Sequence, residues 1–322
     1  MPLNIVRYQI EDTVSWGLIA QGKISPLAIP CTTTADLITL GLPALHVEAT
    51  KEVASIEVDQ VKLLSPITSN SKVLCQGANY RQHIIDSGLD PDAQTFNMFF
   101  TKSSASITDP QGTIIKPSHV KLLDYEIELT LVLGKKTNDA VQITDENLHE
   151  FVAGICIGND VSARDVQIPQ MQFHKGKSYR TFCPLGPVLC LLTRDELHYL
   201  NALNLTLTVN GEVRQSDSSA NLVFKPAETL TEFSQIANFE PGDVLMTGTP
   251  TGCALGLPPP AVVRLTGLLP EAKKWQLFKK SQQRRSQYLQ AGDHIELSIS
   301  SRDGQIDLGR QHHIIVDEGQ HS

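Results

Sequence analysis

The chain lacks any long hydrophobic run: none approaches the roughly 18 apolar residues that a membrane-spanning helix needs. Its first residues lack the basic start and apolar stretch of a signal peptide. A net charge of −8 leaves no basic excess, which argues against nucleic-acid binding. The six cysteines form no Cys-x-x-Cys pair and no zinc spacing with histidine. We therefore expect a cytoplasmic globular protein with reduced thiols and with neither membrane nor nucleic-acid partners.

Signatures of several common enzyme classes are also missing. Gly-x-Ser-x-Gly and His-Glu-x-x-His do not occur, which argues against a serine hydrolase and a zincin. Gly176-Lys-Ser178 resembles the end of a phosphate-binding loop, but that loop needs a glycine where Met171 stands. The segment Gly248–Gly252 lacks the third glycine and the strand-to-helix setting of a dinucleotide site. What remains is chemistry based on acidic side chains.

Glu126 and Glu128 begin an apolar run, Glu126–Leu133, that is typical of a β-strand. Alternate side chains of a strand share a face, so both carboxylates point the same way. Adjacent carboxylates in apolar surroundings repel each other and lose hydration, so something must neutralise them. A divalent cation, an arginine or lysine, or a shared proton would each do so. The simpler alternative is a solvated strand face.

A third carboxylate, Asp160, ends a second apolar run that predicts a buried strand, Val152–Asp160. An acid at a strand end is well placed to complete a site begun by two acids on a neighbouring strand. Three carboxylates without a thiolate or a clear imidazole ligand favour a hard cation, which means Mg²⁺, Mn²⁺ or Ca²⁺. The alternative is that Asn159-Asp160 forms a turn or a helix cap.

The order of predicted elements favours a β-rich α+β fold. Residues 1–68 are expected to form a small, mostly β N-terminal module with one short helix near Ala35–Leu40, and residues 69–322 the main domain. Strands outnumber helices and do not alternate regularly with them, which argues against a doubly wound sheet. A helix is expected at Glu228–Phe239. Other strands are expected at Asn4–Ile10, Val14–Ala20, Lys72–Gln76, Phe96–Thr101, Leu203–Val209, Val244–Thr247, His294–Ile299 and His312–Val316.

The segment 254–290 interrupts this pattern with Pro258-Pro-Pro260 and a stretch rich in lysine and arginine. It could attract an anionic substrate or an acidic partner. The simpler interpretation is a solvated amphipathic helix anchored by Trp275, Leu277, Phe278 and Tyr288.

Eight short motifs in order resemble the fumarylacetoacetate hydrolase family, over roughly residues 70–316. They are Gly77-Ala-Asn-Tyr-Arg-Gln-His83, Phe100-Thr-Lys-Ser-Ser-Ala105, Asp124-Tyr-Glu-Ile-Glu-Leu129, Gly158-Asn-Asp-Val-Ser-Ala-Arg-Asp165, Gly176-Lys-Ser178, Pro184-Leu-Gly-Pro187, Glu240-Pro-Gly-Asp243 and Thr247-Gly-Thr-Pro-Thr-Gly252. The resemblance implies a mixed β-sandwich roll, a homodimer, and a divalent cation, most often Mg²⁺, held by Glu126, Glu128 and Asp160.

The same resemblance implies the other site residues. His83 matches the catalytic histidine, and Asp86 falls where many smaller members have the glutamate that partners it. Lys177 matches a lysine that faces the substrate. Arg164 and Gln167 match side chains near the metal and substrate, and Thr249 matches a contact to the substrate carboxylate.

The function implied is a metal-dependent hydrolase that cleaves a carbon–carbon bond in a 3-acylpyruvate-type or fumarylacetoacetate-like dicarbonyl acid. Fumarylacetoacetase has a further metal-binding aspartate upstream of its histidine, and the sequence offers no match among Cys75–Asn79. This favours the smaller, acylpyruvase-like members. A decarboxylase or hydroxydienoate isomerase of the same family is the alternative, because one enolate-stabilising site serves all three reactions. A non-catalytic relative that binds metabolites or partners is a third possibility.

Overall fold

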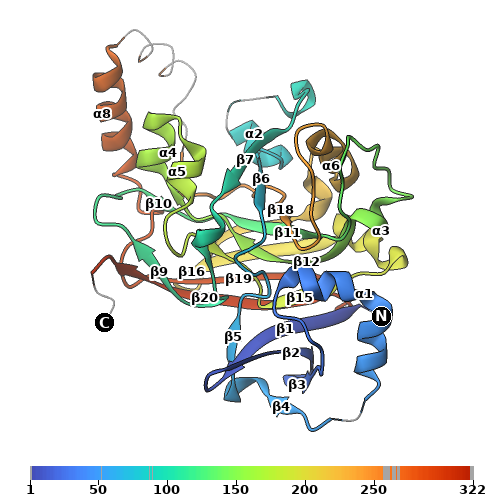
Figure 1. Cartoon of the computed structure of the whole chain (residues 1–322). Coiled ribbons are helices and arrows are strands. Elements are labelled where there is room, and N and C mark those ends of the chain that lie inside the picture. The colour runs from blue at the N-terminus through green and yellow to red at the C-terminus, as the bar shows by residue number, and fades with distance from the viewer. Residues whose placement is uncertain are drawn as a thin grey trace.

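The computed structural model describes residues 2–51, 53–86, 88, 90–256, 262, 266 and 269–319 (Figure 1). Its large sheet is ordered β4 (Ile56–Glu57), β3 (Lys23–Pro26), β2 (Thr13–Ala20), β1 (Leu3–Ile10), β15 (Val188–Leu191), β12 (Val152–Asn159), β11 (Ile127–Leu133), β18 (Val244–Met246), β6 (Val73–Gly77) and β7 (Met98–Lys102), with β5 (Lys62–Leu64) paired to β1. A smaller sheet is ordered β17 (Glu212–Ser218), β16 (Leu203–Val209), β19 (His294–Ser301), β20 (Asp307–Asp317) and β9 (Gln111–Lys116).

Shorter elements connect and cover the sheets. Two small strand pairs are β10 (Leu123–Asp124) with β13 (Ser162–Ala163), and β8 (Ile107–Thr108) with β14 (Cys183–Pro184). The described helices are α1 (Thr34–Ala49), α2 (Arg81–Asp86), α3 (Leu148–Phe151), α4 (Arg164–Gln170), α5 (Phe173–Lys177), α6 (Pro226–Ser234) and α8 (Glu271–Gln282). Short 3₁₀ turns lie at Val58–Gln60, Pro91–Ala93, Ser104–Ser106, Arg194–Asn201 and Ser219–Asn221.

The two sheets pack face to face, with β11 and β12 of the large sheet against β16, β19 and β20 of the smaller one. Strand β11 is therefore buried on both faces. Leu129 and Leu131 lie in one hydrophobic core with Leu205 of β16. Val132 lies on the opposite face, in a second core with Leu37 of α1. The expected β-rich α+β sandwich is confirmed.

The N-terminal strands β1–β4 and α1 gather at one end of the molecule (Figure 1). Strand β1 pairs antiparallel with β15, so these strands extend the large sheet. A domain boundary at residue 68 stays a prediction. Helix α1 begins with a capping box between Thr33 and Asp36, which satisfies two free amides of its first turn. It runs past the expected Ala35–Leu40, across a break at Gly41, to Ala49.

Two helix predictions differ from the structure in detail. Helix α6 ends at Ser234, so the expected continuation to Phe239 is wrong. Leu230 and Phe233 are buried as expected, but Ile236 lies beyond the helix and is 64% exposed. In the basic segment the expected helix is α8, which ends at Gln282. Of its expected anchors, Leu277 is 42% exposed, and the buried Tyr288 lies beyond the end of the helix.

The C-terminal end of α8 is fixed to the body by polar contacts. Gln282 is buried, and its Nε2 donates to Gly256 O at 2.7 Å. Its Oε1 accepts from the Tyr288 hydroxyl at 2.8 Å. Residues 257–261, 263–265 and 267–268, which include Pro258–Pro260, lie outside the described residues. None of the described helices is long and apolar enough to span a bilayer.

Candidate metal centre and active site

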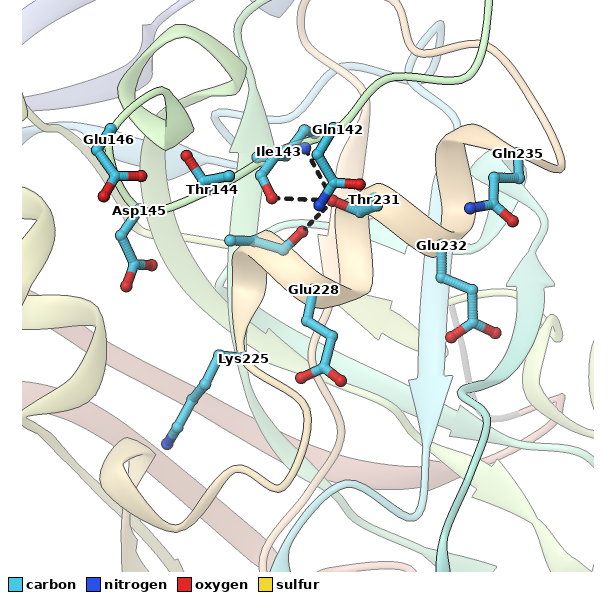
Figure 2. Close-up of a pocket in the computed structure, with 11 residues that line it drawn as sticks. Gln142, Ile143, Thr144, Asp145, Glu146, Lys225, Glu228, Thr231, Glu232 and Gln235 are labelled. Atoms are coloured by element: carbon cyan, nitrogen blue, oxygen red, sulfur yellow. Dashed lines mark hydrogen bonds between the residues drawn. The ribbon is translucent and has the colours of Figure 1, made fainter.

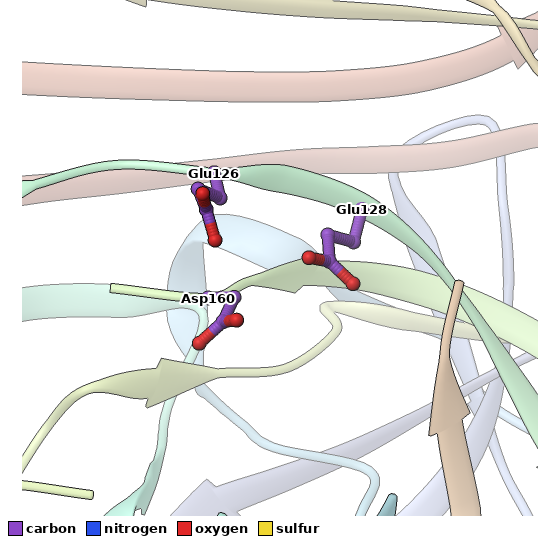
Figure 3. A group of neighbouring side chains, drawn as sticks. All are labelled: Glu126, Glu128 and Asp160. Atoms are coloured by element: carbon purple, nitrogen blue, oxygen red, sulfur yellow. The ribbon is translucent and has the colours of Figure 1, made fainter. Parts of the chain in front are cut away.

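The three acids singled out in the sequence meet where β11 begins and β12 ends. The strands pair antiparallel with Ile127 opposite Asn159, which places Glu126 beside Asp160. The Asp160 amide donates to Glu126 O at 2.8 Å. One carboxylate oxygen from each of Glu126, Glu128 and Asp160 lies within 4.8 Å of the others, and Figure 3 shows the three side chains around a common point. All three are buried.

Two lysines bring positive charge to these acids. The Lys177 ammonium, at the end of α5, lies 2.6 Å from Glu126 Oε2 and 2.5 Å from Asp160 Oδ2. Lys102, at the end of β7, lies 2.5 Å from Asp160 Oδ1. Both lysines are buried, so their charges act across a medium of low dielectric. The position of the Lys177 ammonium shows that the space between the Glu126 and Asp160 carboxylates attracts positive charge.

Arg164, the first residue of α4, organises the other side of the cluster. Its Nε donates to Asp124 Oδ2 at 2.8 Å, and its Nη2 donates to Glu126 Oε1. Its Nη1 donates to Gln167 Oε1 at 2.8 Å, one helical turn further on. The amide NH₂ of Gln167 therefore points away from the guanidinium. Arg164 orients Glu126 and Gln167 and neutralises the buried Asp124.

The cluster holds more acids than cations. The acids Asp124, Glu126, Glu128 and Asp160 outnumber the cations Lys102, Lys177 and Arg164 by one. Burial raises the pKa of Glu126, but Arg164 and Lys177 outweigh that effect and hold it below its usual value. Burial raises the pKa of Glu128, and the charges of Asp160 and Glu126 raise it further. Glu128 is therefore the acid whose ionised form the protein stabilises least.

This donor set fits a divalent cation. Three buried carboxylates offer only oxygen atoms, which are the ligands that Mg²⁺, Mn²⁺ and Ca²⁺ prefer. A bound divalent ion would stabilise the ionised form of Glu128, which the protein alone disfavours. The three acids form a buried group able to hold a metal ion, and the ligand roles assigned from the sequence stay predictions.

The glycine-bordered loop Thr247–Gly252 lies against the acids. Gly248 donates its amide to Glu128 Oε2 at 2.9 Å. Its φ is +92°, and a Cβ there would meet Asn79 Cβ at 3.0 Å, so only glycine fits. Thr249 is buried; its hydroxyl donates to Ile127 O and accepts from the Gln215 amide, each at 2.9 Å. The protein already satisfies this hydroxyl, and its contact with a substrate carboxylate stays a prediction.

His83 lies on α2, partly buried, within the electrostatic influence of the cluster. Burial lowers the pKa of His83; Glu126 opposes this change, and Arg164 adds to it. The charge of Asp86, one turn later, also acts on the imidazole. Asp86 is exposed and accepts hydrogen bonds from Gln82 Nε2 at 2.8 Å and from the Thr251 hydroxyl. Asp86 therefore contacts Thr251 of the glycine-bordered loop, and its pairing with His83 stays a prediction.

Three residues of the cluster were not predicted from the sequence. Lys102 is the last residue of β7 and the one charged residue in that strand. This single charge was the sequence signal that could have pointed to its role. Asp124 stands two residues before Glu126 in the same acidic motif. Cys253 directly follows the glycine-bordered loop, and its Sγ lies 3.7 Å from Glu126 Oε1.

A separate cavity of about 540 Å³ lies between α6 and the loop 142–146 (Figure 2). The Thr231 hydroxyl joins its two sides, accepting from the Ile143 amide at 2.9 Å and donating to Ile143 O at 3.0 Å. Acids and one lysine line it: Asp145, Glu146, Glu228, Glu232 and Lys225. No residue of the carboxylate cluster is among its lining residues, so it takes no part in the chemistry proposed below.

The model of the fumarylacetoacetate (FAA) hydrolase C-terminal family matches residues 72–315. The chain belongs to the fumarylacetoacetate hydrolase family. The resemblance seen in the eight motifs is thereby confirmed, and the match spans the strands and loops that form the acidic cluster.

Curated relatives and a solved structure agree with this membership. An oxaloacetate tautomerase of Bacillus subtilis (strain 168) is 39% identical over 211 residues, which cover 64% of this chain and 68% of the relative. A mitochondrial oxaloacetate tautomerase of Rattus norvegicus is 34% identical over 259 residues, covering 79% of this chain and 80% of the relative. A fumarylacetoacetate hydrolase from the psychrophile Exiguobacterium antarcticum superposes with a TM-score of 0.73 at 29% identity, covering 98% of this chain and 99% of that one.

Proposed function

We propose that the protein catalyses the keto–enol tautomerisation of a 2-oxo diacid with the help of a divalent cation, and that oxaloacetate is the first substrate to test. The observation that carries the proposal is the convergence of Glu126, Glu128 and Asp160 beside Lys177 in a buried site. Two relatives named as oxaloacetate tautomerases support the choice of reaction. The proposal replaces carbon–carbon hydrolysis as the leading hypothesis.

A divalent cation held by Glu126, Glu128 and Asp160 would supply Lewis-acid stabilisation of negative charge on the oxygens of a 2-oxo acid. Lys177 keeps its proton, because Asp160 and Glu126 raise its pKa against the opposing effect of burial. Its ammonium neutralises charge that develops on the substrate oxygen. Arg164 binds Gln167 Oε1, so the NH₂ group of Gln167 is the part that would donate to a substrate carboxylate.

Tautomerisation moves one proton between oxygen and carbon, and the substrate is neither oxidised nor reduced. From enol to keto, the O–H bond breaks, a C–H bond forms at the neighbouring carbon, and the double bond shifts from carbon–carbon to carbon–oxygen. We assign the proton transfer to His83, since its lowered pKa keeps the imidazole neutral and able to accept a proton at neutral pH. The charge of Asp86 stabilises the imidazolium that forms.

Hydrolysis of an acylpyruvate is the second candidate, and the partly buried, neutral imidazole of His83 favours it. The same base that moves a proton on the substrate can take one from water. The solved structure from Exiguobacterium antarcticum, named as a fumarylacetoacetate hydrolase, also supports this candidate.

A panel of three assays separates these reactions. Enol-oxaloacetate ketonisation, oxaloacetate decarboxylation and acylpyruvate hydrolysis are each measured with Mg²⁺, with Mn²⁺ and after chelation. We expect ketonisation to show the highest kcat/KM and to fall to the uncatalysed rate on chelation. Faster hydrolysis than ketonisation would favour the second candidate. Metal binding without turnover in any assay would identify a non-catalytic relative.

The pH profile tests the role of His83. Because the folded pKa of His83 lies below the ordinary 6.5, the neutral base is present above that pKa and is lost as the pH falls through it. We expect the acid limb of kcat/KM, measured at saturating metal, to have its midpoint below pH 6.5. A midpoint at or above pH 6.5, or an unchanged limb in His83→Ala, would remove the base assignment.

The homodimer implied by the family stays a prediction, which sedimentation of the purified protein would test directly.

A further inference from the structure

The helix that carries His83 is too short to hold its own position. Helix α2 has six residues, Arg81–Asp86, and a free helix of that length is unstable in water. Tyr80 and Ile84 are buried and fix its inner side. Its last turn, with Ile85 and Asp86 exposed, has less apolar anchoring. The orientation of His83 therefore depends on what holds the C-terminal turn of α2.

At that turn the Asp86 carboxylate is bound by two donors. A carboxylate in the last turn of a helix opposes the helix dipole, so this residue needs local compensation. Gln82 supplies one hydrogen bond within α2, from Nε2 to Oδ1 at 2.8 Å. The Thr251 hydroxyl supplies the other, to Oδ2, from a segment 165 residues away in the sequence. The second contact links the last turn of α2 to a distant segment, while at the first turn Arg81 forms an ion pair with Asp92 at 2.6 Å.

Thr251 belongs to the loop that is fixed to the acidic cluster on both sides. Before it, the Gly248 amide donates to Glu128 Oε2 at 2.9 Å. After it, the Ala254 amide donates to Asp124 Oδ1 at 2.7 Å. The position of Thr251 relative to the carboxylates is therefore set within three residues in either direction. Through its hydrogen bond to Asp86, Thr251 fixes the last turn of α2 relative to the same carboxylates.

We propose that Thr251 is a positioning residue for His83: its hydrogen bond to Asp86 holds α2 at the distance from the acidic cluster that proton transfer requires. The proposal deepens the function proposed above and rests on it. His83 and Asp86 are three residues apart and share a face of the helix, so tethering one places the other. Asp86 then acts in two separable ways, through its charge on the imidazole and through its bond to Thr251.

Substitutions of Thr251 isolate the tether. Thr251→Val keeps the shape of the side chain but removes the donor, and Thr251→Ser keeps the donor. We expect Thr251→Val to lower kcat roughly 10- to 100-fold, because an error of about 1 Å in placing a catalytic group has an effect of that order. KM and Mn²⁺ affinity should change little, since the cluster itself is intact. Thr251→Ser should recover most of the lost kcat.

Hydrogen–deuterium exchange of the metal-free protein gives a readout that does not depend on turnover. We expect amides of residues 80–86 to exchange faster in Thr251→Val and in Asp86→Ala than in the wild type. Asp86→Asn keeps an acceptor for Thr251, so its residues 80–86 should exchange like those of the wild type. Because the charge of Asp86 raises the pKa of His83, its loss should move the acid limb of the pH profile to lower pH. Thr50→Val, in which an exposed hydroxyl bonded to Val47 O is removed, is the matched control.

The outcomes are decisive. If residues 80–86 exchange at the wild-type rate in Thr251→Val, the proposal that Thr251 holds α2 is wrong. It is also wrong if they exchange faster while kcat stays within twofold of the wild type. If Thr251→Val does not fold, Thr251→Ala against Thr251→Ser makes the same comparison. A wild type without turnover on any substrate would refute the proposed function, and the exchange comparison would still decide whether the tether exists.

Discussion

Glu128→Gln is expected to weaken Mn²⁺ binding by about 100-fold or more and, at the same time, to raise the melting temperature of the metal-free protein. Loss of groups that merely support metal ligands already lowers affinity 10- to 100-fold, so loss of a ligand should do at least as much. The gain in stability has an electrostatic cause. Glu128 has a raised pKa in the folded state, so its ionised form destabilises the fold as pH rises above its ordinary 4.5.

Thermal melts at pH 7 measure both effects. In chelator, Glu128→Gln should melt roughly 2 °C or more above the wild type; in saturating Mn²⁺ the order should reverse, because only the wild type gains stability from the ion. Glu296→Gln makes the same chemical change at an exposed position of β19 and should shift neither melt. Equal Mn²⁺ affinity in wild type and Glu128→Gln would show that Glu128 is not a ligand.

His83→Ala is expected to lower kcat for ketonisation by about 10²- to 10⁴-fold, which is the usual contribution of a positioned general acid–base group. Mn²⁺ affinity should not change, because the imidazole lies outside the group of carboxylates that can hold the ion. The rate must be measured above the spontaneous ketonisation of the substrate.

His46→Ala is the matched control for that experiment. His46 is exposed on α1, where its Nδ1 contacts Leu42 O at 2.9 Å. It should keep the wild-type kcat. Turnover in His83→Ala within threefold of the wild type would exclude His83 as the proton carrier. Lys177 would then be the next candidate for that role.

The convergence of the acids was predictable because it depends on local rules. Alternation along β11 places Glu126 and Glu128 on one face, and antiparallel pairing with the next strand in the sequence brings Asp160 to the start of β11. Their cationic partners were harder to foresee. Lys102 is 58 residues from Asp160 and reaches it from β7, at the edge of the large sheet, so the pairing depends on the order of the whole sheet.

Strands were predicted where apolar residues alternate or run together, as in β11, β12, β16 and β19. Strand β17 was missed because Glu212–Ser218 contains almost no apolar residues and lies at the edge of the smaller sheet. The end of α6 was misplaced because Ile236 fits the helical period, although the chain has already left the helix at Ser234. In each case tertiary context overrode the local pattern.

The contacts of Asp86 also depend on tertiary structure that the local sequence does not reveal. The spacing of three residues from His83 correctly suggested a shared helix face, yet Thr251, the partner that connects α2 to the acidic cluster, comes from a loop with no sequence signal toward Asp86. Glutamate, usual at this position in smaller family members, would extend the carboxylate by one methylene and change this contact.

A crystal soaked in Mn²⁺ and recorded for anomalous scattering tests the central claim most directly. One strong anomalous peak is expected between Glu126, Glu128 and Asp160, with an oxygen of each bound to it and with the Lys177 ammonium moved away from the point it occupies between Glu126 and Asp160. No peak at saturating Mn²⁺, with Lys177 still bridging those two acids, would contradict the claim that this cluster is a metal centre.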